Sequence, residues 1–336
     1  MLPGGKHFFV FMFILCSVRP KERNIIMNEK FLPEGLLYGT MQNREYISSV
    51  TGLEKAMREG KILEAPAAMC DSETNLYIDL GEIRGFMPRN EVALCRSGEE
   101  LKSIAIITRV GKPVCFKVTA ITEERGIMVA HLSRRAAQAE CKRQFLGDLI
   151  SGDIIKAKVT HMENFGAFVD IGCGIVSLLT IDCISISRIS HPADRFEVGE
   201  YIPVIVKSID TINDRIFVTH KELLGTWEEN AAAFMPAETV SGIVRSIEDY
   251  GVFVELAPNL AGLAECKSGV KVGDIASVYI KSILPERMKI KLVIIDSVRG
   301  TLSQKRKYFI DTEKVTHIDC WRYSPDCAAK TVETVF

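Results

Sequence analysis

The chain has 336 residues, enough for two or three domains at about 150 residues per domain. Its 47% hydrophobic and 25% charged residues, with 24 Gly and 12 Pro, are typical of globular proteins and exclude collagen-like, mucin-like and wholly disordered classes. The 42 basic and 43 acidic residues leave a net charge of −1, so no global field attracts nucleic acid or a membrane, and any polyanion site must be local.

An apolar run at residues 8–18, flanked by basic residues, lies near the N-terminus. Eleven residues are too few to span a bilayer as a helix. A secretory signal has a similar pattern, but no small-x-small cleavage site closes the run and basic residues follow it. We therefore expect residues 1–45 to be an extension and lead-in, with Met27 as the working start of a cytoplasmic protein with no membrane partner. A signal peptide or a lipid-anchored form is the alternative.

The chain then repeats itself. Residues 159–171 read V-T-H-M-E-N-F-G-A-F-V-D-I, and residues 244–256 read V-R-S-I-E-D-Y-G-V-F-V-E-L. A weaker copy, around residues 60–114, precedes them. Self-similarity of this kind indicates repeated structural units. We expect three units and a tail: 46–146, 147–233, 234–303 and 304–336.

Within a unit the hydrophobic period is two, as in Ile155, Ala157 and Val159, which alternate with polar residues. This period is typical of half-buried strands. Four or five short strands per unit, separated by Gly-containing turns and with no long helical crossover, predict a small antiparallel barrel. Helical patterns lie mainly before and between the units, at residues 53–59, 134–146 and 221–234, and Thr51 and Glu54 have the spacing of a capping box.

The chemistry-bearing residues do not form an enzyme motif. There is no P-loop, GxSxG, HExxH or helix-opening GxGxxG, and His161 and His191 have no carboxylate partner fixed nearby in sequence. The ten cysteines are scattered with no CxxC pair, which favours reduced thiols. His317, Cys320 and Cys327 come nearest to a metal signature, but the two cysteines are too widely spaced. We expect no catalysis, no metal and no cofactor.

The repeated motif places aromatic rings on the surface. Alternation directs Phe168 and Asp170 to solvent, and we expect Gly166 to relax the strand into a turn or bulge that turns Phe165 outward as well. Two interpretations fit such rings: they plug the end of a barrel, or they stack on unpaired bases. The second copy, with Tyr250 and Phe253 in register, favours stacking.

The second unit continues with V-G-E at residues 198–200, R-I-F-V-T at 215–219 and then Lys221. This series resembles the RNA-binding repeat of ribosomal protein S1. Residues 46–336 as a whole resemble the short, three-repeat S1 homologues of Gram-positive bacteria. The resemblance implies an all-β fold, with three tandem five-stranded OB-fold barrels joined by short helical linkers.

In that family, RNA is held by the two rings of the Phe-Gly-x-Phe turn, a His after the third strand, and an Asp and an Arg around the last turn. The resemblance assigns these roles in the second unit to Phe165, Phe168, Asp210 and Arg215, with Thr180 at the His position. In the third unit it assigns them to Tyr250, Phe253 and Lys289, with Glu265 and Leu284 at the His and Asp positions.

The first unit keeps Tyr77 but has Thr74 at the position of the first ring and Pro88 at the His position. We therefore expect it to contact protein, in particular the small ribosomal subunit, as the leading repeats of the family often do.

Charge is divided unevenly among the units. Residues 46–146 carry 15 basic and 13 acidic residues, 147–233 carry 7 and 13, and 234–310 carry 11 and 8. The third unit therefore supplies the basic face, on which Lys289 and Lys291 share one side by period two. Lys156 and Lys158, on the polar side of a strand in the second unit, complete the predicted RNA-binding set.

The exposed rings predict a protein that binds single-stranded RNA, and the resemblance implies that this RNA is mRNA and that the protein acts in translation. The alternative is a scaffold for ribosomal or RNA-decay proteins that binds RNA only weakly.

Overall fold

The computed structural model describes residues 30–95, 100–300, 302 and 306–336. The apolar run at 8–18 and the proposed start at Met27 lie outside the described residues. Within the described part, no helix has the length and apolar character needed to cross a membrane.

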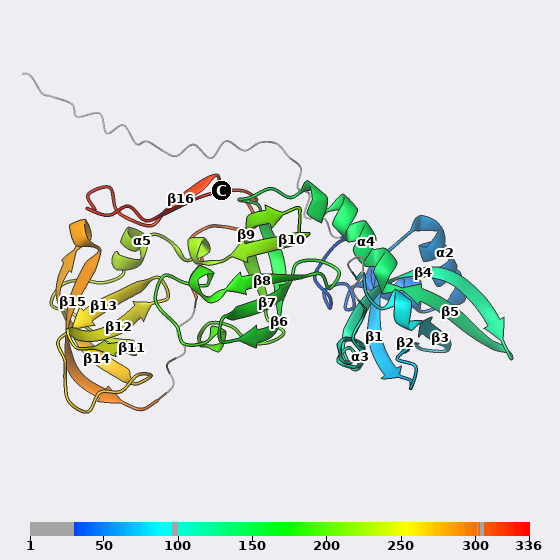
Figure 1. Cartoon of the computed structure of the whole chain (residues 1–336), viewed down its shortest axis with the longest axis horizontal. Coiled ribbons are helices and arrows are strands. Elements are labelled where there is room, and N and C mark those ends of the chain that lie inside the picture. Colours follow the sequence, from blue (N-terminus) through cyan, green and yellow to red (C-terminus); the bar gives the residue numbers. More distant parts are fainter. Residues whose placement is uncertain (1–29, 96–99, 301, 303–305) are drawn as a thin grey trace, which may run out of the picture.

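Three closed five-stranded barrels follow one another along the molecule (Figure 1). In each, the strands neighbour one another in the order first, second, third, fifth, fourth, and the fourth closes on the first. The third and fifth strands are parallel and the other pairs antiparallel. This is the topology of an OB-fold, so the predicted fold class is confirmed.

The strands of the barrels account for most of the regular structure. Barrel 1 contains β1 (Leu63–Cys70), β2 (Leu76–Leu80), β3 (Ile83–Met87), β4 (Pro113–Glu124) and β5 (Ile127–Ser133). Barrel 2 contains β6 (Ile154–Glu163), β7 (Gly166–Asp170), β8 (Val176–Thr180), β9 (Tyr201–Asp210) and β10 (Arg215–Thr219). Barrel 3 contains β11 (Thr239–Glu248), β12 (Gly251–Ala257), β13 (Leu260–Ala264), β14 (Ile275–Leu284) and β15 (Lys289–Val298).

Short helices precede, interrupt and join the barrels. They are α1 (Met41–Ile47), α2 (Val50–Glu59), α3 (Ser103–Ile107), α4 (Arg134–Gln144) and α5 (Trp227–Ala231), with 3-10 turns η1 (Arg89–Glu91), η2 (Leu146–Asp148), η3 (Ile181–Cys183), η4 (Pro192–Asp194), η5 (Lys221–Leu224) and η6 (Pro285–Arg287). The tail ends in a two-stranded sheet of β16 (Cys320–Arg322) and β17 (Glu333–Val335).

Two helical segments differ from the sequence prediction. Helix α2 begins at Val50, because the Ser49 hydroxyl accepts the Gly52 amide hydrogen bond, so Thr51 lies inside the helix rather than at its cap. The pattern at 221–234 divides into η5 and α5 because Gly225, between them, has φ +82°, and a Cβ at this position would lie 2.5 Å from the Phe309 ring.

The strand alternation places the core as predicted. Ala167, Val169 and Ile171 are buried in the barrel 2 core, and the barrels have separate hydrophobic clusters. Eight of the described cysteines are free thiols: Cys70, Cys95, Cys115, Cys141, Cys173, Cys183, Cys266 and Cys327.

Residues 30–38, which we call the lead-in strap, join barrels 1 and 2. Glu34 is buried, and its carboxylate accepts hydrogen bonds from the Arg134 guanidinium at 2.6 and 3.0 Å and from the Cys115 amide at 3.1 Å. Its own amide donates to Asp170 Oδ2 at 2.8 Å. One carboxylate therefore connects barrel 1, helix α4 and barrel 2.

Barrels 2 and 3 are joined by buried ion pairs and by the tail. Glu255 of β12 accepts hydrogen bonds from Arg195 at 2.6 Å and from Arg245 Nε of β11 at 2.7 Å. Because Arg195 lies at the C-terminal end of η4, this carboxylate links η4 to barrel 3. His317 of the tail lies 2.7 Å from Asp153, and the Tyr323 hydroxyl donates to the Asn259 carbonyl at 2.6 Å. The tail therefore contacts both barrels (Figure 1).

Candidate nucleic-acid interface

The first ring of the motif lies in the tight turn between β6 and β7. Glu163 pairs with Gly166, which leaves Asn164 and Phe165 as the two turn residues, and Phe165 is 55% exposed. Gly166 serves a different purpose from the predicted one. A Cβ at this position would lie 2.5 Å from the Leu179 carbonyl oxygen, so the glycine permits the close approach of β8.

The predicted bulge is on the opposite strand. The β6–β7 register shifts between Val159 and His161, which turns His161 to the outer face directly opposite Phe168. The two rings lie nearly parallel, with centroids 6.0 Å apart and planes at 21°, while Phe165 meets Phe168 edge-on at 6.0 Å. His161, which the sequence left as an isolated histidine, is therefore part of an aromatic cluster.

Cross-strand pairing extends this cluster across barrel 2. Phe168 of β7 lies opposite Leu178 of β8, and Leu178 lies opposite Phe217 of β10. We call such a line of outward cross-strand neighbours the ring row; in barrel 2 it consists of His161, Phe168, Leu178 and Phe217. None of the four belongs to the hydrophobic core. Sequence reasoning missed His161 and Phe217 because their place depends on register and on the bulge.

Asp210 and Arg215 face each other where β9 turns into β10. The Asp210 carboxylate accepts hydrogen bonds from the backbone of Asn213 and Ile212 and from the Asn213 side chain. These bonds lower the pKa of Asp210, and the backbone N–H of Asn213 has the largest effect. Asp210 therefore stays ionised and holds the turn. Arg215 is exposed beside it, two residues before Phe217 on the same strand.

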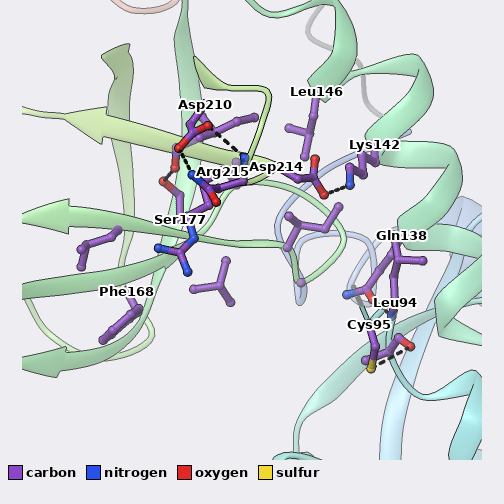
Figure 2. A pocket seen from close by; sticks show the side chains of 18 of the residues that line it. Leu94, Cys95, Gln138, Lys142, Leu146, Phe168, Ser177, Asp210, Asp214 and Arg215 are labelled. Atoms are coloured by element: carbon purple, nitrogen blue, oxygen red, sulfur yellow. Dashed lines mark hydrogen bonds and ion pairs between the residues drawn. The ribbon is translucent and has the colours of Figure 1, made fainter. Parts of the chain in front are cut away.

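Phe168, Asp210 and Arg215 line one wall of a cleft of about 1370 Å³. Figure 2 shows them on the barrel 2 side, with Gln138 and Lys142 of helix α4 on the other. The structure thus brings together three of the predicted barrel 2 residues, and Phe165 contacts them through Phe168.

Lys156 and Lys158 have protein partners. The Lys158 ammonium donates to the Glu34 carbonyl at 2.8 Å and lies over the Tyr201 ring, while Lys156 is 3.8 Å from Glu313 of the tail. Their role in RNA binding stays a prediction.

The expected exposure of Asp170 is wrong, because the lead-in strap covers it. Its side chain is buried and accepts hydrogen bonds from the amides of Glu34, Gly172 and Gly174. Burial, followed by the nearby Glu34 charge, raises the pKa of Asp170 to about 6.

Barrel 3 repeats the arrangement with a more basic row. Tyr250 is 71% exposed and meets Phe253 edge-on, with centroids 6.1 Å apart. Phe253 lies opposite Leu263, and Leu263 lies opposite Lys291, so the predicted lysine occupies the row position of Phe217. Lys289 lies opposite Leu284 at the start of β15, in the place of Arg215.

Comparisons with known proteins agree with this geometry. Residues 148–221, which contain barrel 2, match the S1 RNA binding domain. The small ribosomal subunit protein bS1 of Staphylococcus haemolyticus is 30% identical over 277 residues, which is 80% of this chain and 66% of that protein. The bS1 homolog of Bacillus subtilis is 30% identical over 253 residues, 73% of this chain and 62% of the relative. The chain thus spans slightly less than two thirds of the length of these relatives. On this domain match and this similarity, the chain belongs to the ribosomal protein S1 family.

Proposed function

We propose that this protein binds single-stranded RNA, with mRNA as its substrate in translation, through barrels 2 and 3. The observation that carries the proposal is the cluster of Phe165, Phe168 and His161 beside Arg215, inside the S1-matched residues and echoed by Tyr250 and Phe253. In this proposal the protein acts in the cytoplasm as a binding protein, without catalysis or a cofactor.

The chemistry of the face favours unpaired bases. Bases stack on exposed rings with little sequence preference, whereas the bases of a duplex are already stacked on each other. Only a few cations, among them Arg215, Lys289 and Lys291, accompany the rings. We therefore expect a shallower salt dependence than that of a strongly basic binder.

Fluorescence anisotropy tests this proposal. The full chain is titrated into labelled single-stranded RNA of about 12 nucleotides, within the usual site size of OB-folds, and into a duplex of equal length. We expect tighter binding to the single strand at every salt concentration. Equal or stronger duplex binding would contradict a stacking mechanism.

Association with the small ribosomal subunit is proposed for barrel 1. The segment between β3 and β4 exposes four large apolar side chains: Leu94, Ile104, Ile107 and Val110. Ile104 is 63% exposed, and exposed apolar side chains of this kind are typical of protein contacts.

Co-sedimentation with purified small subunits tests this part separately. Ile104→Asp and Ile107→Asp should reduce co-sedimentation while leaving the affinity for a short RNA unchanged. Met235→Asp, on another exposed apolar side chain in the linker before barrel 3, is the control. If the barrel 1 variants sediment with subunits as the unaltered chain does, this surface is not the contact.

A further inference from the structure

Barrel 1 lacks the Phe-Gly-x-Phe motif but contains an aromatic ring row of its own. Tyr77 of β2 lies opposite Phe86 of β3, and Phe86 lies opposite His131 of β5. The Tyr77 and Phe86 centroids are 5.5 Å apart, and Phe86 meets His131 edge-on at 6.1 Å. These three rings are partly exposed, and none belongs to the barrel 1 core.

The row is structurally equivalent to that of barrel 2. The first strand of each barrel has a bulge at the same point, between Ala67 and Met69 in barrel 1 and between Val159 and His161 in barrel 2. Counted from this bulge, Tyr77 corresponds to Phe168 on the second strand. By the same pairing, Phe86 corresponds to Leu178 and His131 to Phe217.

Hydrogen bonds hold the outer rings of the row. The Tyr77 hydroxyl lies 3.4 Å from Asp71 Oδ2, and His131 Nε2 lies 3.0 Å from the Thr122 hydroxyl. Rings held in this way lose little conformational freedom when a base stacks on them.

A cation lies on the same side of the row as Arg215 does in barrel 2. In barrel 2, Arg215 lies two residues before the row residue Phe217. The equivalent position in barrel 1, two residues before His131, is Val129, which pairs directly with Arg84 of β3. Arg84 is exposed, so barrel 1 presents its cation one strand away from the motif position.

We propose that barrel 1 is a third site for single-stranded RNA, on which bases stack against Tyr77, Phe86 and His131 while Arg84 contacts the phosphate backbone. This inference rests on the proposed function and deepens it. It departs from the expectation that barrel 1 contacts protein only, which rested on motif positions rather than on the row. None of the row residues is among the exposed apolar side chains between β3 and β4.

Zero-length UV crosslinking of the full chain to oligouridine, followed by peptide mass spectrometry, tests the site directly. We expect crosslinked peptides from β2 and β3 of barrel 1 as well as from the Phe165–Phe168 turn. Phe86→Leu with His131→Ala should reduce the barrel 1 crosslinks at least about 5-fold and leave those of barrel 2 unchanged. Leucine is the residue at the same row position in barrels 2 and 3, so the variant suits the fold, and circular dichroism checks it.

The outcomes separate this inference from the proposed function. Crosslinks in barrels 2 and 3 alone would overturn the barrel 1 site and leave the proposed function intact. Crosslinks in barrel 1 alone would support the site and contradict the placement of RNA on barrels 2 and 3. A chain that crosslinks nowhere would overturn both.

The charge of Arg84 is tested in a chain in which Phe168→Ala and Phe253→Ala remove the second ring of the motif from barrels 2 and 3. In this background, Arg84→Ala should lower the salt dependence of RNA binding by about 0.7 in log–log slope, as expected for one lost phosphate contact with a single strand. Arg58→Ala, on the exposed side of helix α2, is the matched control. An equal slope in the two variants would mean that Arg84 does not contact phosphate.

Discussion

Phe168 and Phe253 show why the surface interpretation of the motif is preferable to a barrel plug. Each ring lies on the outer face of its barrel, outside the hydrophobic clusters that contain its neighbours Val169 and Val254. Each also contacts the exposed ring of the preceding turn edge-on. Such rings contribute little to the core, so their removal should affect a ligand more than the fold.

We expect Phe168→Ala and Phe253→Ala each to weaken single-stranded RNA binding by about 1 to 3 kcal/mol, the scale of one stacked base. The melting temperature should barely change. Lys289→Ala should cost less and mainly flatten the salt dependence. Anisotropy and thermal melting of the same variants measure both effects, with the exposed Val198→Ala as control.

The plug interpretation makes the opposite prediction. A core phenylalanine truncated to alanine costs about 3 to 5 kcal/mol of folding free energy. If Phe168→Ala strongly lowers the stability of barrel 2 while the RNA affinity of the folded fraction is unchanged, the ring row stabilises the fold and does not bind RNA.

His220 gives the protein a pH-dependent stability. It is fully buried, with Nδ1 3.2 Å from the Ile184 carbonyl and Nε2 3.2 Å from the Tyr308 hydroxyl. Burial lowers its pKa to about 3, despite the hydrogen bond to Ile184. The unfolded chain, in which the histidine pKa is about 6.5, therefore binds one more proton between these values, and stability from this residue is lost as the pH falls below 6.5.

At pH 5 this loss should reach about 2 kcal/mol relative to pH 7. Urea denaturation of the unaltered chain and of His220→Gln at both pH values isolates the effect as the difference between their pH dependences. Comparison with the variant is needed because the buried Asp170, whose pKa is raised, makes the protein more stable as the pH falls, which opposes the effect of His220. His161→Gln, on the surface, is the control. Identical pH dependences for the His220 variant and the unaltered chain would show that His220 is not responsible.

Among the elements, the lead-in strap joins barrels 1 and 2 through the buried residue Glu34. Burial alone would raise the pKa of Glu34, but the charge and hydrogen bonds of Arg134 hold it at about 2, so the pair is ionised. Arg134 also donates to the carbonyls of Val92 and Gly174, one in each barrel. The strap and helix α4 together fix barrel 1 against barrel 2.

Glu34→Gln should therefore destabilise the protein by about 3 to 5 kcal/mol, because it leaves the buried Arg134 charge without its counter-ion. Chemical denaturation followed by circular dichroism measures this loss. Glu54→Gln, on an exposed side of α2, should change stability little. Similar stabilities for the two variants would mean that the strap does not couple the barrels.

At the scale of the whole molecule, the tail connects barrels 2 and 3. Ile318, Trp321 and Tyr323 are buried in the same hydrophobic cluster as the barrel 3 core. The Ile154 amide of barrel 2 donates to Thr316, and the Trp227 amide of the linker donates to Tyr323. The tail thereby holds barrels 2 and 3 in one arrangement.

Deletion of residues 316–336 should separate the unfolding of barrels 2 and 3 into two calorimetric transitions. Affinity for an RNA long enough to reach both barrels should fall, because the second contact loses effective concentration, while affinity for a short RNA stays the same. Calorimetry and anisotropy with both RNA lengths test this. A single transition with unchanged affinity for the long RNA would show that the ion pairs around Glu255 suffice to join the barrels.

The sequence by itself determined the fold class and the outward direction of the motif rings. Period-two alternation, glycine-containing turns and the repeated motif are local patterns, so the three barrels and the exposure of Phe165 and Tyr250 could be read without a structure. Asp210 and Arg215 followed from the family resemblance, and their proximity to Phe168 agrees with it.

Only the tertiary structure decided which other residues share a face with these rings. His161, Phe217, Phe86 and His131 join their rows through bulges and cross-strand register, and register is set by pairing between segments far apart in the chain. The burial of Asp170 likewise depends on the lead-in strap, more than a hundred residues earlier in sequence. Long-range contacts of this kind leave no local pattern, because each strand alternates in the same way whatever covers its outer face.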